Sequence, residues 1–207
     1  MALPTKFLRL HPYETHDPGF PKLAPPRQSC IPVRLILFPP ALLTDLGTNT
    51  PIFARHLKPG GWIEFQEIDH FPYSQDGELA ADNPIRLYWS HIHAALRSIN
   101  VQVNNAPRLA SLMRSAGFVN VTERIYFTPI GPWPHNKQLR EVGMYWRTVL
   151  IEGLEAIALR PFTKVLGWRT EEIEAFLAEV KEAYMDPRTR AYMPFYIVYG
   201  QKPMTVE

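Results

Sequence analysis

Three polar residues that could do acid–base chemistry stand together at the end of an apolar segment. Residues 62–70 read WIEFQEIDH, so Glu67, Asp69 and His70 end or follow what we interpret as a buried strand. Ligands of open parallel sheets bind outside the carboxyl ends of the strands, which makes this cluster the best-placed polar group in the chain. A histidine beside carboxylates can serve as a general base near neutral pH. The alternative is that Glu67 and Asp69 cap loops or pair with cations.

A second group of candidate residues is aromatic. Trp133, His135, Tyr145 and Trp146 lie in or after a proline-containing loop over residues 130–136. Aromatic walls suit flat, apolar small molecules, so we interpret these four side chains as candidates for binding such a substrate. The alternative is that Tyr145 and Trp146 are core residues at helical spacing.

Hydrolase and metal chemistry find no support in the sequence. No serine stands in a GxSxG setting, and no HxxxH or paired-cysteine spacing occurs. His91 and His93 are two residues apart on a predicted helix, about 200° around its axis, and so cannot share a metal on one face. Cys30 is the single cysteine, which is typical of a reducing, intracellular setting and permits no cysteine-based metal site. We therefore expect no metal.

Length and composition favour one globular domain. The chain has 207 residues, of which 46% are hydrophobic and 20% charged, enough for one hydrophobic core. The formal net charge is +2 and no basic stripe is present, so we expect no nucleic-acid partner. The longest apolar run, residues 35–43, contains two prolines and is too short to cross a bilayer. With no secretory signal at its start, the chain is expected to have no membrane partner and to be cytoplasmic or nuclear.

The elements that must position these residues alternate between strands and helices. Residues 1–32 contain seven prolines, which predicts an irregular arm ahead of a domain over residues 33–207. Residues 33–38 (VRLILF) and 62–68 (WIEFQEI) predict parallel strands, joined by a short helix over residues 51–57. Parallel strands need helical cover on both faces of their sheet. Further along we expect helices opened by Asn83, near Pro107, by Asn136 and by Thr170, and strands over residues 119–128 and 195–200.

Four segments of the sequence carry a resemblance to a known family. They are residues 56–69 (HLKPGGWIEFQEID), 116–121 (AGFVNV), 130–136 (IGPWPHN) and 193–203 (MPFYIVYGQKP). Together they resemble the carboxy-terminal half of class I S-adenosylmethionine methyltransferases, and most of all the fungal secondary-metabolism group called LaeA-like. The resemblance implies an α/β fold with a partial Rossmann-like sheet, made of the family's fourth to seventh strands. It also implies an antiparallel pair of final strands, with helices inserted between them as a lid over substrate.

The same resemblance implies a reaction and a cofactor. The reaction is transfer of a methyl group from S-adenosylmethionine to an oxygen, nitrogen or carbon nucleophile of a small molecule. The family holds this cofactor on a glycine-rich turn after its first strand and on an acidic residue that ends its second. The eleven glycines include no GxGxxG or GxGxG spacing, and only 32 residues precede the first predicted strand. We therefore assign no cofactor-binding residue and expect the cofactor-binding half to be missing.

The missing cofactor motif leaves three interpretations of this protein open, and they belong to different classes. One is a methyltransferase whose donor site is supplied by a partner chain or is non-standard. The second is a cofactor-independent pseudoenzyme that binds or cyclises a small molecule, or acts as a scaffold. A shortened gene model is a third alternative and predicts poor solubility. A sheet that begins at residues 33–38 exposes an unpaired edge, so we expect a homo-oligomer or a partner chain there unless the proline-rich arm covers it.

Overall fold

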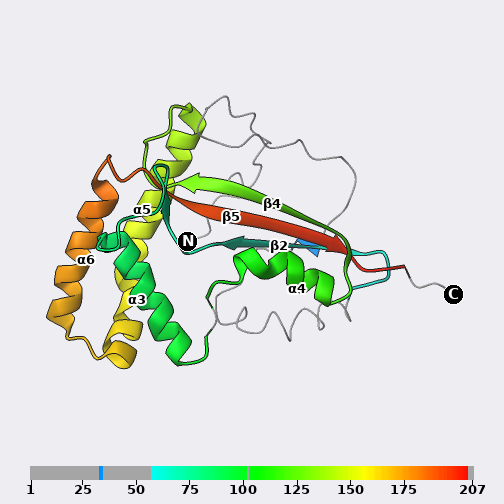
Figure 1. Cartoon of the computed structure of the whole chain (residues 1–207), viewed down its shortest axis with the longest axis horizontal. Coiled ribbons are helices and arrows are strands. Elements are labelled where there is room, and N and C mark those ends of the chain that lie inside the picture. Colours follow the sequence, from blue (N-terminus) through cyan, green and yellow to red (C-terminus); the bar gives the residue numbers. More distant parts are fainter. Residues whose placement is uncertain (1–32, 35–56, 102, 205–207) are drawn as a thin grey trace. The chain divides into compact units, whose positions relative to one another are not determined.

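The computed structural model describes residues 33–34, 57–101 and 103–204, which are coloured in Figure 1. The chain divides into two compact units, Met1–Cys30 and Ile31–Glu207, and the described residues all belong to the second. The expected proline-rich arm, the helix over residues 51–57 apart from Leu57, and most of the strand over residues 33–38 lie outside the described residues.

A mixed sheet forms the centre of the described structure. β2 (Trp62–Ile68) pairs in parallel with β1 (Val33–Arg34) and antiparallel with β5 (Ala191–Gln201). On its other side β5 pairs antiparallel with β4 (Val119–Pro129), while the first residues of β5 also pair with the short β3 (Tyr73–Ser74). The expected α/β class, the parallel pairing of β1 with β2 and the antiparallel pairing of the two final strands are confirmed. β3 was not expected, because two residues are too few to show an alternating pattern.

One apolar core lies between the sheet and α4 (Leu109–Ser115), which Figure 1 shows against the strands. Alternate residues of β2 and β5 point toward this helix because successive side chains of a strand face opposite sides. The core includes Ile63, Phe65, Leu109, Met113, Phe118 and Val198. The helix expected near Pro107 is present: a turn of 3-10 helix at Ala106–Arg108 leads into α4. Gly117 follows with φ 87°, a left-handed conformation that glycine adopts without strain.

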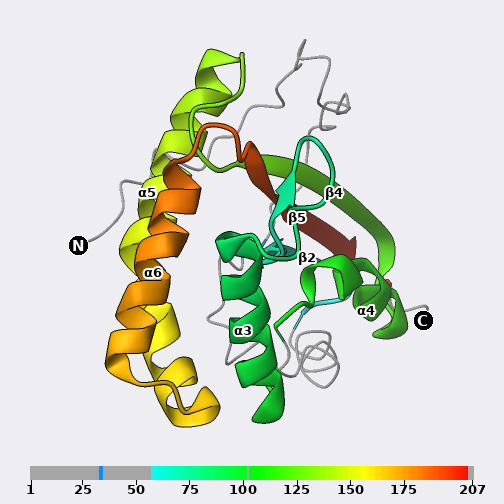
Figure 2. The ribbon, with the colours of Figure 1, turned by 60° about the vertical axis from the view of Figure 1, so that its left-hand side comes forward.

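The remaining helices form a second apolar core beyond the carboxyl end of β2. They are α3 (Pro84–Ser98), α5 (Lys137–Arg160), the π-helical segment η3 (Pro161–Leu166) and α6 (Thr170–Met185), gathered on one side of the sheet's end in Figure 2. α5, η3 and α6 are inserted between β4 and β5, as expected. None of the helices described in the structure is long and apolar enough to span a membrane.

Local sequence signals explain where most of these helices begin. The side chain of Asn83 accepts a hydrogen bond from the backbone of Ile85 at 2.9 Å, and Asn136 caps α5 in the same way. The expected cap of α6 is corrected by one residue. Thr170 is the first helical residue, and the capping residue is Arg169, whose backbone N–H donates to Glu172 Oε2 at 2.8 Å. Glu172, three positions after Arg169, therefore decides where α6 begins.

Two buried hydrogen bonds join the helices to one another. The hydroxyl of Tyr88 on α3 donates to the carbonyl of Leu154 on α5 at 3.0 Å. The indole N–H of Trp89 donates to the hydroxyl of Tyr184 on α6, also at 3.0 Å. Both aromatic side chains of α3 are buried, at 0% and 4% exposed, so each polar group finds its partner inside the core. α3 is thereby fixed in position, and with it the loop that connects it to β2.

Candidate functional site

Asp69 closes the end of β2 and shapes the loop that follows. Its backbone N–H donates to the carbonyl of Pro194 at 2.9 Å, which extends the pairing of β2 with β5 by one residue. The carboxylate is 2% exposed. Its Oδ1 accepts from the backbone of Phe71 at 3.1 Å and its Oδ2 from the hydroxyl of Tyr73 at 3.4 Å. Burial raises the pKa of Asp69, and these two hydrogen bonds oppose the rise.

Glu67 is the carboxyl group of the cluster whose charge changes near neutral pH. It is half-buried in β2, directly opposite Tyr196 of β5. Burial raises the pKa of Glu67 to about 7, although a hydrogen bond from the backbone of Ile68 to its Oε1, at 3.2 Å, acts in the other direction. A carboxyl group with a pKa near the working pH can both take up and release a proton. The structure therefore favours Glu67 over His70 for acid–base chemistry.

His70 packs into the aromatic wall of α3 rather than against the carboxylates. Its ring lies 5.0 Å from the ring of Trp89, measured between centroids. Burial lowers the pKa of His70 to about 4, so its imidazole is neutral at pH 7 and is a weak base. The three candidates at the end of β2 thus have different partners: Glu67 accepts from Ile68, Asp69 from Phe71 and Tyr73, and His70 packs on Trp89.

His93 of α3 lies close to this cluster and was not among the candidate residues. His93 is 3% exposed, and its ring centroid lies 5.3 Å from that of Phe71. Burial lowers the pKa of His93 to about 4, with smaller effects from His70 and Arg97. Its Nε2 has no hydrogen-bond partner in the described structure. The sequence could show that His93 shares a helix with Trp89, but not that this helix turns the histidine toward the loop after β2.

The buried histidines predict a loss of stability in mild acid. Between pH 6.5, the ordinary pKa of histidine, and about pH 4, the unfolded chain binds protons that the folded chain does not. The free energy of unfolding therefore falls as the pH falls through this window. In His93→Leu we expect the loss between pH 7 and pH 5 to be smaller by about 1–2 kcal/mol, measured by urea unfolding at both pH values.

Glu67 supplies a control of opposite sign for this measurement. Its pKa is raised from 4.5 to about 7, so between these pH values the folded chain binds a proton that the unfolded chain does not. Glu67 therefore contributes more stability as the pH falls through this window. Glu67→Gln removes that compensation and should enlarge the loss between pH 7 and pH 5. An equal loss in the wild-type protein and in His93→Leu would show that His93 titrates in the folded chain as it does in the unfolded one.

The four aromatic candidates divide into two groups. Trp133 is half-buried and its indole N–H donates to the carbonyl of Ala191 at 2.9 Å. Trp146 is half-buried against the helical core, and its Nε1 has no hydrogen-bond partner in the described structure. His135 and Tyr145 are exposed, Tyr145 at 59%. Trp146 thus packs on the core as the structural alternative expected, whereas Tyr145 lies on the surface.

The loop that carries Trp133 meets the loop after β2 at the start of β5. Ala191 accepts hydrogen bonds from both Trp133 and the backbone of Ile130, at 2.9 and 2.8 Å. The same residue pairs with Ser74 of β3 across the sheet. One strand end therefore connects the aromatic loop with the segment that Asp69 holds in place.

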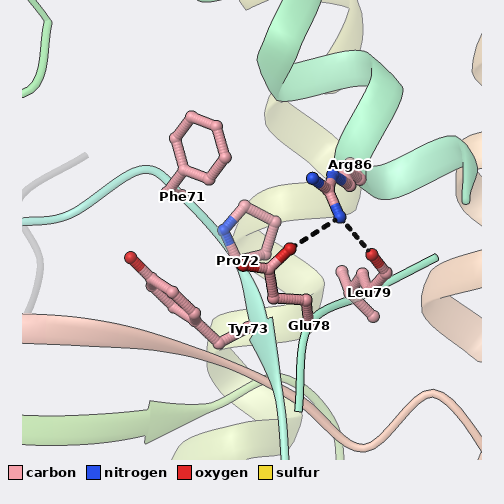
Figure 3. Close-up of a pocket in the computed structure, with 6 residues that line it drawn as sticks. All are labelled: Phe71, Pro72, Tyr73, Glu78, Leu79 and Arg86. Atoms are coloured by element: carbon pink, nitrogen blue, oxygen red, sulfur yellow. Dashed lines mark hydrogen bonds and ion pairs between the residues drawn. The ribbon is translucent and has the colours of Figure 1, made fainter. Parts of the chain in front are cut away.

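A pocket of about 170 Å³ opens in the connection between β2 and α3 (Figure 3). Arg86 donates from Nη1 to Glu78 Oε2 at 3.2 Å and to the carbonyl of Leu79 at 2.6 Å. Sequence reasoning missed this site. The signal that could have found it is the cap at Asn83, which places Arg86 in the first turn of α3. The lining residues are Phe71, Pro72, Tyr73, Glu78, Leu79 and Arg86.

The described residues do not fit a cofactor site of the family's kind. Asp69 is an acidic residue at a strand end, but both of its carboxylate oxygens already accept bonds from its own loop. The Gly60–Gly61 turn is closed on itself, because a Cβ on Gly61 would lie 2.9 Å from the carbonyl of Lys58. Within residues 57–101 and 103–204, no group of three His, Cys, Asp or Glu side chains could hold a metal ion.

Comparisons with known proteins bear on the expected resemblance to fungal methyltransferases. No family model matches the sequence. The chain is 35% identical over 147 residues to the probable methyltransferase tdiE of Emericella nidulans, a match that covers 71% of this chain and 46% of that protein. It is 34% identical over 148 residues to the methyltransferase pytC of Aspergillus terreus, covering 72% of this chain and 46% of the relative.

A regulator is also among the relatives. The secondary metabolism regulator LAE1 of Cochliobolus heterostrophus is 29% identical over 150 residues, covering 72% of this chain and 49% of that protein. The chain spans about half the length of the curated relatives it matches. The expected similarity to fungal methyltransferases and to LaeA-like regulators is thereby confirmed over about 72% of the chain.

Solved structures give weaker matches. One is phosphoethanolamine N-methyltransferase 2 of Haemonchus contortus in complex with S-adenosyl-L-methionine, with a TM-score of 0.36 and 14% identity, covering 77% of this chain and 30% of that one. Another is a putative sarcosine dimethylglycine methyltransferase from Galdieria sulphuraria, with a TM-score of 0.33 and 15% identity, covering 79% and 49%.

Proposed function

We propose that this chain takes part in methyl transfer from S-adenosylmethionine to a small molecule of fungal secondary metabolism. The observation that carries the proposal is the 35% identity over 147 residues to a protein named as a probable methyltransferase. The geometry of the described residues adds an acid–base group and a pocket near the carboxyl end of β2. Ligands of α/β sheets bind at this end of the strands.

Glu67 is proposed as the residue that receives the acceptor's proton. Its Oε1 accepts the backbone N–H of Ile68, which leaves Oε2 available to take a proton from an acceptor hydroxyl or amine. A pKa of about 7 allows the carboxyl to accept that proton at neutral pH and release it afterwards. Asp69 is proposed as a positioning residue, because it holds Phe71 and Tyr73 in place. His70 is proposed as a neutral hydrogen-bond acceptor for the substrate.

The methyl donor must be held by groups other than those described above. We propose that residues outside the described ones, a non-standard site or a partner chain supply that half of the site. The edge of the sheet at β1 is the place proposed for pairing with another copy or with a partner, through backbone hydrogen bonds. Methyl transfer then depends mainly on positioning, since the acceptor must lie in line with the methyl group.

Calorimetric titration of the full chain with S-adenosylmethionine and S-adenosylhomocysteine tests the proposal. We expect micromolar binding of both, and equal binding by Glu67→Gln, because this residue is assigned to the acceptor and not to the donor. Glu67→Gln should nevertheless lower the rate of methylation, by about 100-fold for a lost general base. Absence of binding to a well-folded sample would exclude methyl transfer by the isolated chain.

The alternative function is a cofactor-independent domain that binds or cyclises a small molecule, or acts as a scaffold. One observation favours it: the pocket between β2 and α3 is lined by described residues of this chain, so that binding there requires no site for a methyl donor. Small-molecule binding without any binding of S-adenosylmethionine would support this alternative. Small-molecule binding together with cofactor binding would support the methyltransferase.

A further inference from the structure

The pocket between β2 and α3 has a cation on one side and aromatic rings on the other. Figure 3 shows the rings of Phe71 and Tyr73 on one side, the guanidinium of Arg86 on the other, and Pro72 between them. The volume of about 170 Å³ is below the roughly 300–1,000 Å³ typical of pockets for drug-sized ligands. A single substituted ring is therefore the size of ligand that suits it.

Arg86 is held in position independently of the ion pair that it makes. Its Nη1 donates to the backbone carbonyl of Leu79 at 2.6 Å, and Leu79 is only 6% exposed. Nε and Nη2 of the same guanidinium have no partner in the described structure. A guanidinium with unused donors in a fixed fork matches the two oxygens of a carboxylate. The fixed orientation means that a ligand need not order this side chain when it binds.

The carboxylate of Glu78 already pairs with Arg86 and would compete with the anion of a ligand for the guanidinium. Its Oε2 lies 3.2 Å from Arg86 Nη1, and its side chain is 79% exposed. An ion pair this exposed contributes little to stability, because water and salt screen the charges and the long side chain loses freedom. A carboxylate attached to a ring that also packs in the pocket can therefore displace it.

We infer that this pocket binds a small aromatic carboxylate. The ring lies against Phe71 and Tyr73, and the carboxylate replaces Glu78 at Arg86. Binding itself does not depend on methyl transfer. That such an acid is also an acceptor of the methyl group is a further step, and only this step rests on the proposed function.

The test is an NMR titration of the whole 207-residue chain with benzoate, benzamide and cyclohexanecarboxylate. We expect benzoate to bind about tenfold more tightly than benzamide, which lacks the charge, and more tightly than cyclohexanecarboxylate, which lacks the aromatic face. Arg86→Gln should weaken benzoate binding about tenfold and leave benzamide binding unchanged. Glu78→Gln should strengthen benzoate binding about threefold, because the competing carboxylate is gone.

Arg97→Gln is the matched control, since Arg97 is an exposed basic residue in the last turn of the same helix. It should leave benzoate binding unchanged. If Arg86→Gln fails to fold, Glu78→Gln still decides, because Glu78 is exposed and its replacement disturbs no core. The inference is overturned if the wild-type chain does not bind benzoate, if Arg86→Gln binds it equally well, or if Glu78→Gln binds it more weakly.

The titration also separates this inference from the proposed function. Benzoate binding by a chain that does not bind S-adenosylmethionine would support the pocket and contradict methyl transfer by the isolated chain. Binding of S-adenosylmethionine without binding of benzoate would contradict the inferred pocket and support methyl transfer.

Discussion

Gly143→Ala is expected to destabilise the protein by about 3 kcal/mol or more. A Cβ built on Gly143 would lie 2.1 Å from the carbonyl oxygen of Gly131. The two glycines are also joined by a hydrogen bond from Gly131 N–H to the carbonyl of Gly143, at 2.9 Å. Because the clashing atom belongs to the backbone, the whole loop before α5 must move away. The loss is measured as the shift in the midpoint of urea unfolding.

Gly153→Ala is the matched control on the same helix. There the nearest atom to an added Cβ is the flexible end of Ile157, at 3.6 Å, which is ordinary van der Waals contact. Alanine in a helix interior is favoured over glycine, so we expect Gly153→Ala to stabilise the protein by roughly 0.5–1 kcal/mol. Equal effects of the two substitutions would show that the loop does not rest on α5 at Gly143. Loss of that contact would also displace Trp133, whose candidate role depends on the same loop.

Phe162→Ala is expected to cost about 3–5 kcal/mol of stability. Phe162 is 0% exposed and belongs to η3, the π-helical segment after α5. Its ring packs on Trp168, with 4.9 Å between centroids, and on Tyr88 of α3, at 6.1 Å. Truncation would leave a cavity where α3, η3 and α6 meet, and the surrounding rings can fill it only in part. Urea unfolding followed by tryptophan fluorescence measures the loss, since Trp168 reports on this core.

Ile157→Ala serves as the control for Phe162→Ala. Ile157 lies on α5, a short distance earlier in the chain, and is 40% exposed. Truncation of a partly exposed side chain removes less buried surface and leaves no closed cavity, so we expect a loss of about 1 kcal/mol or less. A loss in Phe162→Ala no greater than that in Ile157→Ala would contradict the packing described for η3.

The local signals in the sequence were sufficient for most of the elements. Asn83 and Asn136 cap their helices as expected, because a cap depends on a side chain and on backbone groups two or three residues away. The strand over residues 62–68 has the bounds that its apolar pattern predicts. Competition between adjacent residues is harder to read from the sequence. Thr170 has the residue type of a helix cap, yet it is the first residue of α6, and Arg169 is the capping residue.

The chemistry of the candidate site could be predicted only in part. The sequence placed Glu67, Asp69 and His70 at the end of a strand, and the structure places them there. It could not show which of them titrates near neutral pH, because the pKa of each side chain depends on burial by distant segments. Burial makes His70 a weak base and brings the pKa of Glu67 to about 7, which reverses the roles that residue type alone suggests.

Local spacing and short motifs in the amino-acid sequence predict the order of the longer strands and helices, the caps of α3 and α5 and the family resemblance. The contact of His93 with Phe71, and the position of Arg86 across a pocket from two aromatic rings, come instead from the packing of distant segments. These residues are separated along the chain by the loop and helix start between β2 and α3. Their contacts arise because α3 is fixed to α5 and α6 by buried hydrogen bonds, which no local pattern in the sequence reveals.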